Sequence, residues 1–178
     1  SSITKSFTAL AVLQLYQNKK LNIYDPVKAY VPSLNLDERV ERLQINHLLF
    51  HSSGFPTLNA AEVLIMKMLG QDTSYITINS FDEFIDLLNL AKEERVAAPG
   101  KKYFYWNEGY IILGKIIENV SGLKYEDYIK NYILLPLKMK RSTFYAKNAV
   151  EDGDFAVPYY FGENWERRAA SIPDNSLN

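Results

Sequence analysis

Cysteine is absent from the 178 residues of this chain. Its absence excludes disulfide bonds, thiolate metal sites and a cysteine nucleophile together. The cellular compartment stays open, because a cysteine-free chain suits reducing and oxidising surroundings alike. No apolar run has the length that a bilayer requires, so we predict no membrane segment within these residues.

A charge excess of either sign is also lacking. The 20 basic and 21 acidic residues leave a net charge of -1, which gives no electrostatic basis for binding nucleic acid or an anionic membrane. The 13 tyrosines are scattered and form no run on which bases could stack. With 47% hydrophobic residues, the composition fits one globular domain with a core.

A secretory signal is missing as well, since no basic segment, apolar segment and small-residue cleavage site occur in that order. The first residue is serine. We therefore expect this chain to be a fragment or a processed piece of a longer protein, and its localisation stays open.

Apolar spacing predicts a mainly helical chain with too few strands for a large sheet. Helices are expected over residues 2–18, 44–51, 60–69, 81–90, 107–120 and 125–135. Strand candidates are 142–145 and 155–161, and a short extended stretch is expected over 102–106. Residues 1–161 are predicted to be the helical portion of one domain, and the polar residues 162–178 a loose tail.

Ser2 and Lys5 stand at the start of the first expected helix, which is apolar on nearly all sides and is therefore expected to be buried. Residues three apart share a helix face, and the helix start offers free backbone N–H groups. A lysine there can take the serine proton and create a nucleophile. The alternative interpretation is a serine N-cap beside a solvated lysine. The spacing recurs at Ser121 and Lys124, where Gly122 indicates a helix C-terminus and no chemistry is expected.

Tyr105 and Asn107 lie where the extended stretch meets the next helix. A tyrosine can carry a proton to a leaving group or assist a lysine base, and an asparagine offers a donor and an acceptor to an amide-like substrate. Tyr16 and Asn18 repeat this spacing inside the first helix, where core packing and a helix end are the expected roles. Neither the Ser2/Lys5 pair nor the Tyr105/Asn107 pair identifies a catalytic site by itself.

His47 and His51 are four residues apart and could share a helix face as zinc ligands do. No third ligand or acidic residue accompanies them in the pattern of a zinc protease. Structural hydrogen bonding at a helix end is the favoured interpretation, and no metal ion or cofactor is expected.

Five blocks together resemble the penicillin-recognising serine hydrolases: class C β-lactamases, D,D-carboxypeptidases and related esterases and aminopeptidases of the peptidase S12 type. The order and spacing of the blocks match that family over nearly the whole chain. The blocks are residues 2–9, 20–32, 45–54, 99–101 and 105–118, which include Ser2-Ile3-Thr4-Lys5, His47-Leu48-Leu49-Phe50-His51-Ser52-Ser53-Gly54 and Tyr105-Trp106-Asn107.

The resemblance implies a role for each residue of the two short motifs. Ser2 would be the acylated nucleophile, with its backbone N–H in the oxyanion hole, and Lys5 the base that activates it. Tyr105 would pass a proton to the leaving group and help to activate water, and Asn107 would hold the substrate. Trp106 is bulkier than the residue usual there, and we expect it to narrow the substrate pocket or to stack on an aromatic group.

Two departures from the family pattern bear on the fold and the activity. The family's third motif, Lys or His followed by Thr or Ser and then Gly, has no convincing copy after Tyr105. The segments that build the family's sheet are not found either. The resemblance thus implies the helical part of an α+β, β-lactamase/transpeptidase-like fold whose antiparallel sheet is largely missing here. A tyrosine at 105 favours the class C and esterase-like branch.

Three functions remain open from the sequence. The first is a serine hydrolase that acts through an acyl-enzyme on a small amide, ester or peptide. The second is a penicillin-binding sensor or binding domain that forms the adduct without turnover, as an isolated fragment would. The third is a structural helical domain in which the four side chains do not converge. The partner expected in the first two is a small molecule or a peptide, and the oligomeric state stays open.

Overall fold

The computed structural model describes residues 2–36, 42–56, 78, 80–90, 95–162 and 164–170. The α-helices within these ranges are α1 (Thr4–Gln17), α2 (Ile45–Leu49), α4 (Phe81–Leu90), α5 (Asn107–Ser121), α6 (Tyr125–Ile129) and α7 (Ala146–Asp152). The other described elements are a 3-10 helix, η1 (Val27–Ala29), a π-helix, η4 (Lys130–Leu134), and two strands, β1 (Tyr159–Phe161) and β2 (Arg167–Ala169).

The prediction of a mainly helical chain is confirmed, and the expected helices that fall within the described residues begin and end within two residues of their expected bounds. Helices η1 and α7 were not expected, and α7 lies between the two strand candidates. The helix expected over 60–69 lies outside the described residues. The strand expected over 142–145 is wrong, because those residues form a loop, and only the last three residues of 155–161 are a strand.

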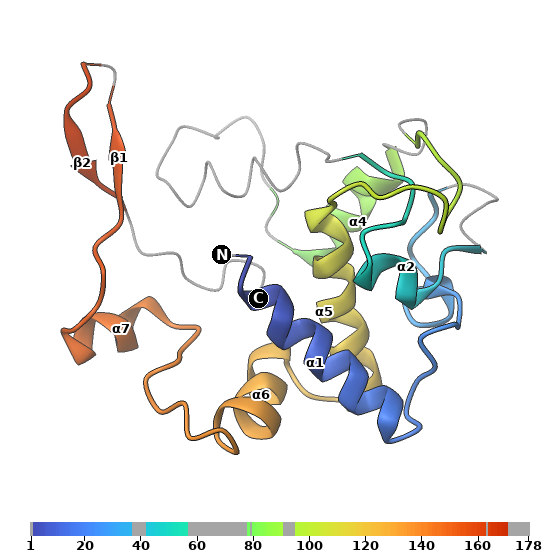
Figure 1. Ribbon diagram of the computed structural model, residues 1–178, viewed down its shortest axis with the longest axis horizontal. Coiled ribbons are helices and arrows are strands. Elements are labelled where there is room, and N and C mark those ends of the chain that lie inside the picture. The colour runs from blue at the N-terminus through green and yellow to red at the C-terminus, as the bar shows by residue number, and fades with distance from the viewer. Residues whose placement is uncertain are drawn as a thin grey trace.

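Helices α1 and α5 pack side by side at the centre of the molecule (Figure 1). The side chains buried between these helices and their neighbours are Ala11, Val12 and Leu15 of α1 and Ile112, Leu113, Ile116 and Ile117 of α5. Helix α6 and η4 contact α1 as well, and α2 packs on α5. Burial of this apolar set holds the N-terminal ends of α1 and α5 together, and the candidate site lies at those ends.

The outer face of α1 differs from the sequence expectation. Leu10, Leu13 and Tyr16 are 41%, 45% and 40% exposed. Among the described residues, α1 is therefore buried on one side and not on nearly all sides.

A turn after α2 supports the stretch that leads into α5. The Phe104 N–H donates to the His51 carbonyl at 2.8 Å, and the Gly100 N–H donates to the Ser52 carbonyl at 2.8 Å. The Gly54 carbonyl accepts the Val96 N–H at 2.9 Å. These bonds tie residues 95–104 to the turn after α2. That turn therefore fixes the position of the stretch before α5.

The helix expected over 125–135 changes its hydrogen-bonding pattern part-way. After α6 the chain continues as the π-helix η4, in which the Leu135 N–H reaches back five residues to the Lys130 carbonyl at 2.9 Å. The helical run ends before Pro136, as expected, because proline cannot continue the hydrogen-bond ladder. The wider turn is a local feature that apolar spacing does not reveal.

Strands β1 and β2 pair antiparallel, with Tyr160 opposite Arg168. Figure 1 shows this hairpin standing apart from the helices. Strand β2 lies within residues 162–178, the segment expected to be a loose tail, and residues 171–178 lie outside the described part. Of the described helices, none is both long enough and apolar enough to span a membrane.

Candidate active site

Ser2 and Lys5 meet Tyr105 and Asn107 at the paired ends of α1 and α5. Ser2 lies in the turn before α1, and its carbonyl accepts the Lys5 N–H at 3.2 Å. Asn107 is the first residue of α5, and Tyr105 stands two residues before it. The packing of the two helices therefore brings together residues about one hundred positions apart.

The four side chains form one hydrogen-bonded group. The Ser2 Oγ atom lies 2.6 Å from the Tyr105 Oη atom, and the Lys5 Nζ atom lies 3.4 Å from Ser2 Oγ. Lys5 Nζ also donates to Asn107 Oδ1 at 2.7 Å. Ser2 is exposed while the other three are half-buried, so the hydroxyl can be reached by a molecule from solvent.

Two tyrosine rings hold the Lys5 side chain. Its Nζ atom lies 5.0 Å from the centre of the Tyr105 ring and 5.6 Å from the centre of the Tyr110 ring. Cation–π contacts of this length restrict where the amine can lie. With Asn107 as hydrogen-bond acceptor, they keep Lys5 Nζ close to Ser2.

The neighbours of Tyr105 make its hydroxyl more acidic than that of an ordinary tyrosine. Burial raises the pKa of Tyr105, but hydrogen bonds with Lys5 and Ser2 and the charge of Lys5 outweigh burial, so that the pKa lies below its ordinary value. A lowered pKa makes the phenol oxygen more available as a proton acceptor near neutral pH.

Sequence reasoning missed Tyr110. Its Oη atom donates to the Leu49 carbonyl at 3.0 Å, and its ring lies against Lys5. The signal that could have found it is the spacing from Asn107, since residues three apart on α5 share one face.

The Trp106 side chain lies in the core. It is 1% exposed and stacks on Phe55, with ring centres 5.1 Å apart. Consecutive residues of an extended stretch point to opposite sides, so Tyr105 faces Lys5 while Trp106 packs inward. The ring thus stacks on an aromatic group of the core, and its expected effect on the substrate pocket stays a prediction.

Comparison with known proteins gives the family. The chain matches the Beta-lactamase family over residues 1–175. It therefore belongs to the beta-lactamase family.

Several known proteins are similar to the chain over most of its length. The octameric penicillin-binding protein homologue from Pyrococcus abyssi is 40% identical, with a TM-score of 0.89, and the match covers 100% of this chain and 39% of that one. Protein flp of Staphylococcus aureus strain MW2 is 33% identical over 83% of this chain and 28% of its own length. Penicillin-binding protein 4* of Bacillus subtilis strain 168 is 30% identical over 82% of this chain and 30% of its own length.

The chain thus spans less than half the length of these similar proteins. Its described residues are mainly helical, with a sheet of two strands. The expectation of the helical part of an α+β fold is confirmed by this combination of partial coverage and high structural similarity.

The two histidines make structural hydrogen bonds. His47 Nδ1 accepts the Gln44 N–H at 3.2 Å, within the capping box of α2, and His51 Nδ1 accepts the Trp106 N–H at 3.0 Å. Among the described residues, no three His, Asp or Glu side chains are grouped so that they could hold a metal ion.

The repeated motifs lie away from the site. Ser121 ends α5 and is followed by Gly122 in the left-handed conformation, with φ of 71°. Tyr16 and Asn18 lie at the other end of α1, and Asn18 caps it. The helix-end roles expected for Ser121 and Asn18 are seen, whereas Tyr16 is exposed and not a core residue.

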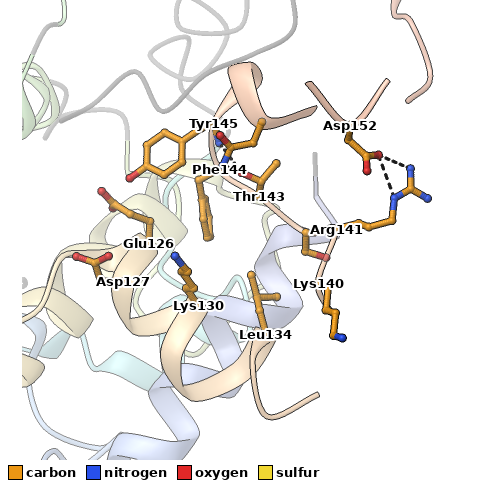
Figure 2. A pocket seen from close by; sticks show the side chains of 12 residues that line it. Glu126, Asp127, Lys130, Leu134, Lys140, Arg141, Thr143, Phe144, Tyr145 and Asp152 are labelled. Atoms are coloured by element: carbon orange, nitrogen blue, oxygen red, sulfur yellow. Dashed lines mark hydrogen bonds and ion pairs between the residues drawn. The ribbon is translucent and has the colours of Figure 1, made fainter. Parts of the chain in front are cut away.

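A cavity of about 340 Å³ lies elsewhere, between α6, η4 and the segment before and within α7 (Figure 2). Side chains of both charges line it, and at one edge Arg141 pairs with Asp152. None of Ser2, Lys5, Tyr105 and Asn107 lines this cavity. It is separate from the candidate active site.

Proposed function

We propose that this chain carries the nucleophile and proton-transfer groups of a serine hydrolase, which acylates Ser2 with a small amide, ester or peptide and releases the acyl group by hydrolysis. The observation that carries the proposal is the position of Ser2 Oγ, 2.6 Å from Tyr105 Oη and 3.4 Å from Lys5 Nζ. A hydroxyl between two proton-transfer groups is the arrangement that nucleophilic catalysis requires.

Acylation begins when Ser2 Oγ bonds to the acyl carbon and gives up its proton. We assign the base to the Lys5–Tyr105 pair. Tyr105 Oη is the nearer acceptor, and Lys5 lowers the pKa of that hydroxyl. The bond from the acyl carbon to nitrogen or oxygen then breaks, and the leaving amine or alcohol takes the proton from Tyr105.

Deacylation runs through the same groups in reverse. Water gives a proton to the Lys5–Tyr105 pair and bonds to the acyl carbon, the bond to Ser2 Oγ breaks, and the proton returns to Ser2. Asn107 is oriented by Lys5 through Oδ1, which leaves its amide nitrogen as a donor for a substrate carbonyl.

A penicillin-binding domain without turnover is the second candidate. Two relatives are named as a penicillin-binding protein and a homologue of one, which favours an acyl adduct with a β-lactam. Both candidates share the acylation step and differ only in release of the acyl group.

The test uses the full-length gene product that contains this chain. A fluorophosphonate probe should add to Ser2, as mapped by mass spectrometry, and Ser2→Ala should abolish the adduct. Ser6→Ala, a change of an exposed serine on the same helix, should leave labelling intact. Labelling that survives Ser2→Ala contradicts the proposal.

Turnover separates the two candidates. A chromogenic ester or β-lactam that gives product over many cycles supports the hydrolase. A single burst equal to the enzyme concentration, with a stable adduct on Ser2, supports the binding domain.

A further inference from the structure

His51 occupies a backbone position that favours glycine. It follows the C-cap residue of α2 with φ of 53°, in the left-handed region. Helices commonly end on glycine there, because a side chain adds a steric cost in this conformation. The imidazole at this position makes contacts that glycine could not make.

The imidazole and the backbone of His51 hold the chain on both sides of Tyr105. The His51 carbonyl accepts the Phe104 N–H at 2.8 Å, and His51 Nδ1 accepts the Trp106 N–H at 3.0 Å. A donor to a histidine nitrogen needs a free lone pair on that atom. The two bonds fix the backbone on either side of Tyr105 with respect to α2.

The ring of His51 also fixes the side chain of Tyr105. The two rings stack with centres 4.3 Å apart and an angle of 30° between their planes. The same phenol ring carries the Tyr105 hydroxyl, which lies 2.6 Å from Ser2 Oγ. A change in the tilt of the ring would therefore move this hydroxyl away from Ser2.

We propose that His51 is the positioning residue of Tyr105: Nδ1 anchors the backbone at Trp106, and the imidazole face orients the phenol toward Ser2 and Lys5. The proposal deepens the proposed function and rests on it for its catalytic meaning. His51 acts through Tyr105 and not on the reacting atoms: its ring contacts Tyr103, Tyr105 and Tyr110, and its Nδ1 accepts the Trp106 backbone N–H.

Burial and a neighbouring charge favour the neutral form of the imidazole. The titratable groups around it are Lys5 from α1, Tyr103 and Tyr105 from the stretch before α5, and Tyr110 from α5. Burial, and then the charge of Lys5, lower the pKa of His51. A neutral ring retains the lone pair that accepts the Trp106 N–H and adds no positive charge beside Lys5.

The test compares two variants with a matched control in the full-length gene product. His51→Gly suits the backbone but removes the ring and the acceptor, and His51→Asn keeps an acceptor oxygen where Nδ1 was. His47→Asn is the control, because His47 Nδ1 also accepts a backbone N–H, but that of Gln44 and not one beside Tyr105. Two readouts are recorded: the rate of acylation by the fluorophosphonate probe, and the titration of Tyr105 by NMR of ¹³C-labelled tyrosine.

We expect His51→Gly to slow acylation about tenfold or more, His51→Asn to recover part of that loss, and His47→Asn to match the parent. We also expect the pKa of Tyr105 to rise in His51→Gly, because the phenol leaves Lys5 and Ser2. A parent-like Tyr105 titration in folded His51→Gly overturns the proposal. If the parent protein is not acylated at all, the proposed function fails, yet the Tyr105 titration still tests the positioning role.

Discussion

The Ser2 Oγ and Tyr105 Oη atoms lie 2.6 Å apart, although 103 positions of the chain separate the two residues. Lys5 Nζ is farther from Ser2 Oγ, at 3.4 Å, and donates to Asn107 at 2.7 Å. The serine proton thus has its shortest path to the tyrosine. The lysine acts on that path by its charge and by its hydrogen bond with Tyr105.

Replacing Tyr105 by Phe should slow acylation of Ser2 by about 10²-fold or more, which is the usual contribution of a group that transfers the proton. Tyr103→Phe is the matched control. It makes the same chemical change two residues away on a side chain that is 67% exposed, and labelling should stay at the parent rate. The measurement is the second-order rate constant for the fluorophosphonate adduct. Equal rates for the two variants would contradict the role of Tyr105.

Replacing Lys5 by Met should raise the pKa of Tyr105. The present pKa is lowered against the effect of burial by hydrogen bonds with Lys5 and Ser2 and by the Lys5 charge, so loss of the amine leaves burial less opposed. The titration is followed by NMR of ¹³C-labelled tyrosine, with Tyr105→Phe used to assign the signal. Lys20→Met, at an exposed position after α1, should leave the titration unchanged. An unchanged Tyr105 pKa in Lys5→Met would show that the lysine does not act on the phenol.

Local sequence patterns predicted most described helices, because apolar spacing and the Gly and Pro signals act over a few residues. The start of α4 shows such a local contact: Ser80 Oγ accepts the Glu83 N–H at 3.2 Å, across the three-residue spacing of a capping box. The π-turn of η4 could not be predicted in this way, since the change from one hydrogen-bonding register to another leaves no clear sequence signal.

The candidate site was predictable only through the combination of its motifs. The spacing of each pair, Ser2/Lys5 and Tyr105/Asn107, recurs elsewhere in the chain. Only the packing of α1 on α5 shows which two pairs lie together. The contact between His51 and Tyr105 links two segments far apart in sequence, and no spacing rule relates such residues. Tertiary structure was needed to find it.

Replacing Gly54 by Ala should destabilise the fold by more than the same change at Gly122. Both glycines have positive φ, of 90° and 71°, so each alanine costs about 1–2 kcal/mol of backbone strain. At Gly54 the new Cβ would also overlap the Ala97 carbonyl, whereas at Gly122 nothing lies within 4 Å.

Urea unfolding of the two variants measures this difference. We expect the midpoint of Gly122→Ala to fall modestly, while Gly54→Ala falls further or fails to accumulate as folded protein. Similar midpoints would show that the segment at Ala97 can move away at no cost. Because the Gly54 carbonyl accepts the Val96 N–H, such movement would also loosen the stretch before α5.

Replacing Gly109 by Ala should lower stability, although alanine is the better helix former. Its Cβ would lie 2.9 Å from Cε3 of the buried Trp106 ring, and overpacking of a core costs about 1–3 kcal/mol against the gain of about 1 kcal/mol in helix propensity. Gly114→Ala is the control on the same helix, since its Cβ meets Tyr125 at an ordinary 3.6 Å. Thermal unfolding should show a lower midpoint for the first and an equal or higher midpoint for the second. A higher midpoint for Gly109→Ala would mean that Trp106 is loosely packed.

The free energy of unfolding should decrease as the pH falls below about 6.5, the pKa of histidine in an unfolded chain. His47 and His51 should account for part of this decrease. Burial and then the charge of Arg95 lower the pKa of His47, while burial and then the charge of Lys5 lower the pKa of His51. Between the lowered folded value and the unfolded value, the unfolded chain binds more protons, so protonation favours unfolding. The stabilisation is therefore fully present above the unfolded pKa and is lost as the pH falls through the folded pKa.

The double variant with Asn at His47 and His51 removes this contribution, since the chain has only these two histidines. The free energy of unfolding, measured in urea at several values from pH 7 to pH 5, should decrease less steeply for the double variant than for the parent. Carboxyl groups titrate in the same range but are common to both proteins, so they cancel in the difference. Identical slopes would mean that both imidazoles accept a proton in the folded chain as readily as in the unfolded one, so that the Trp106 N–H bond to His51 Nδ1 breaks at no cost in stability.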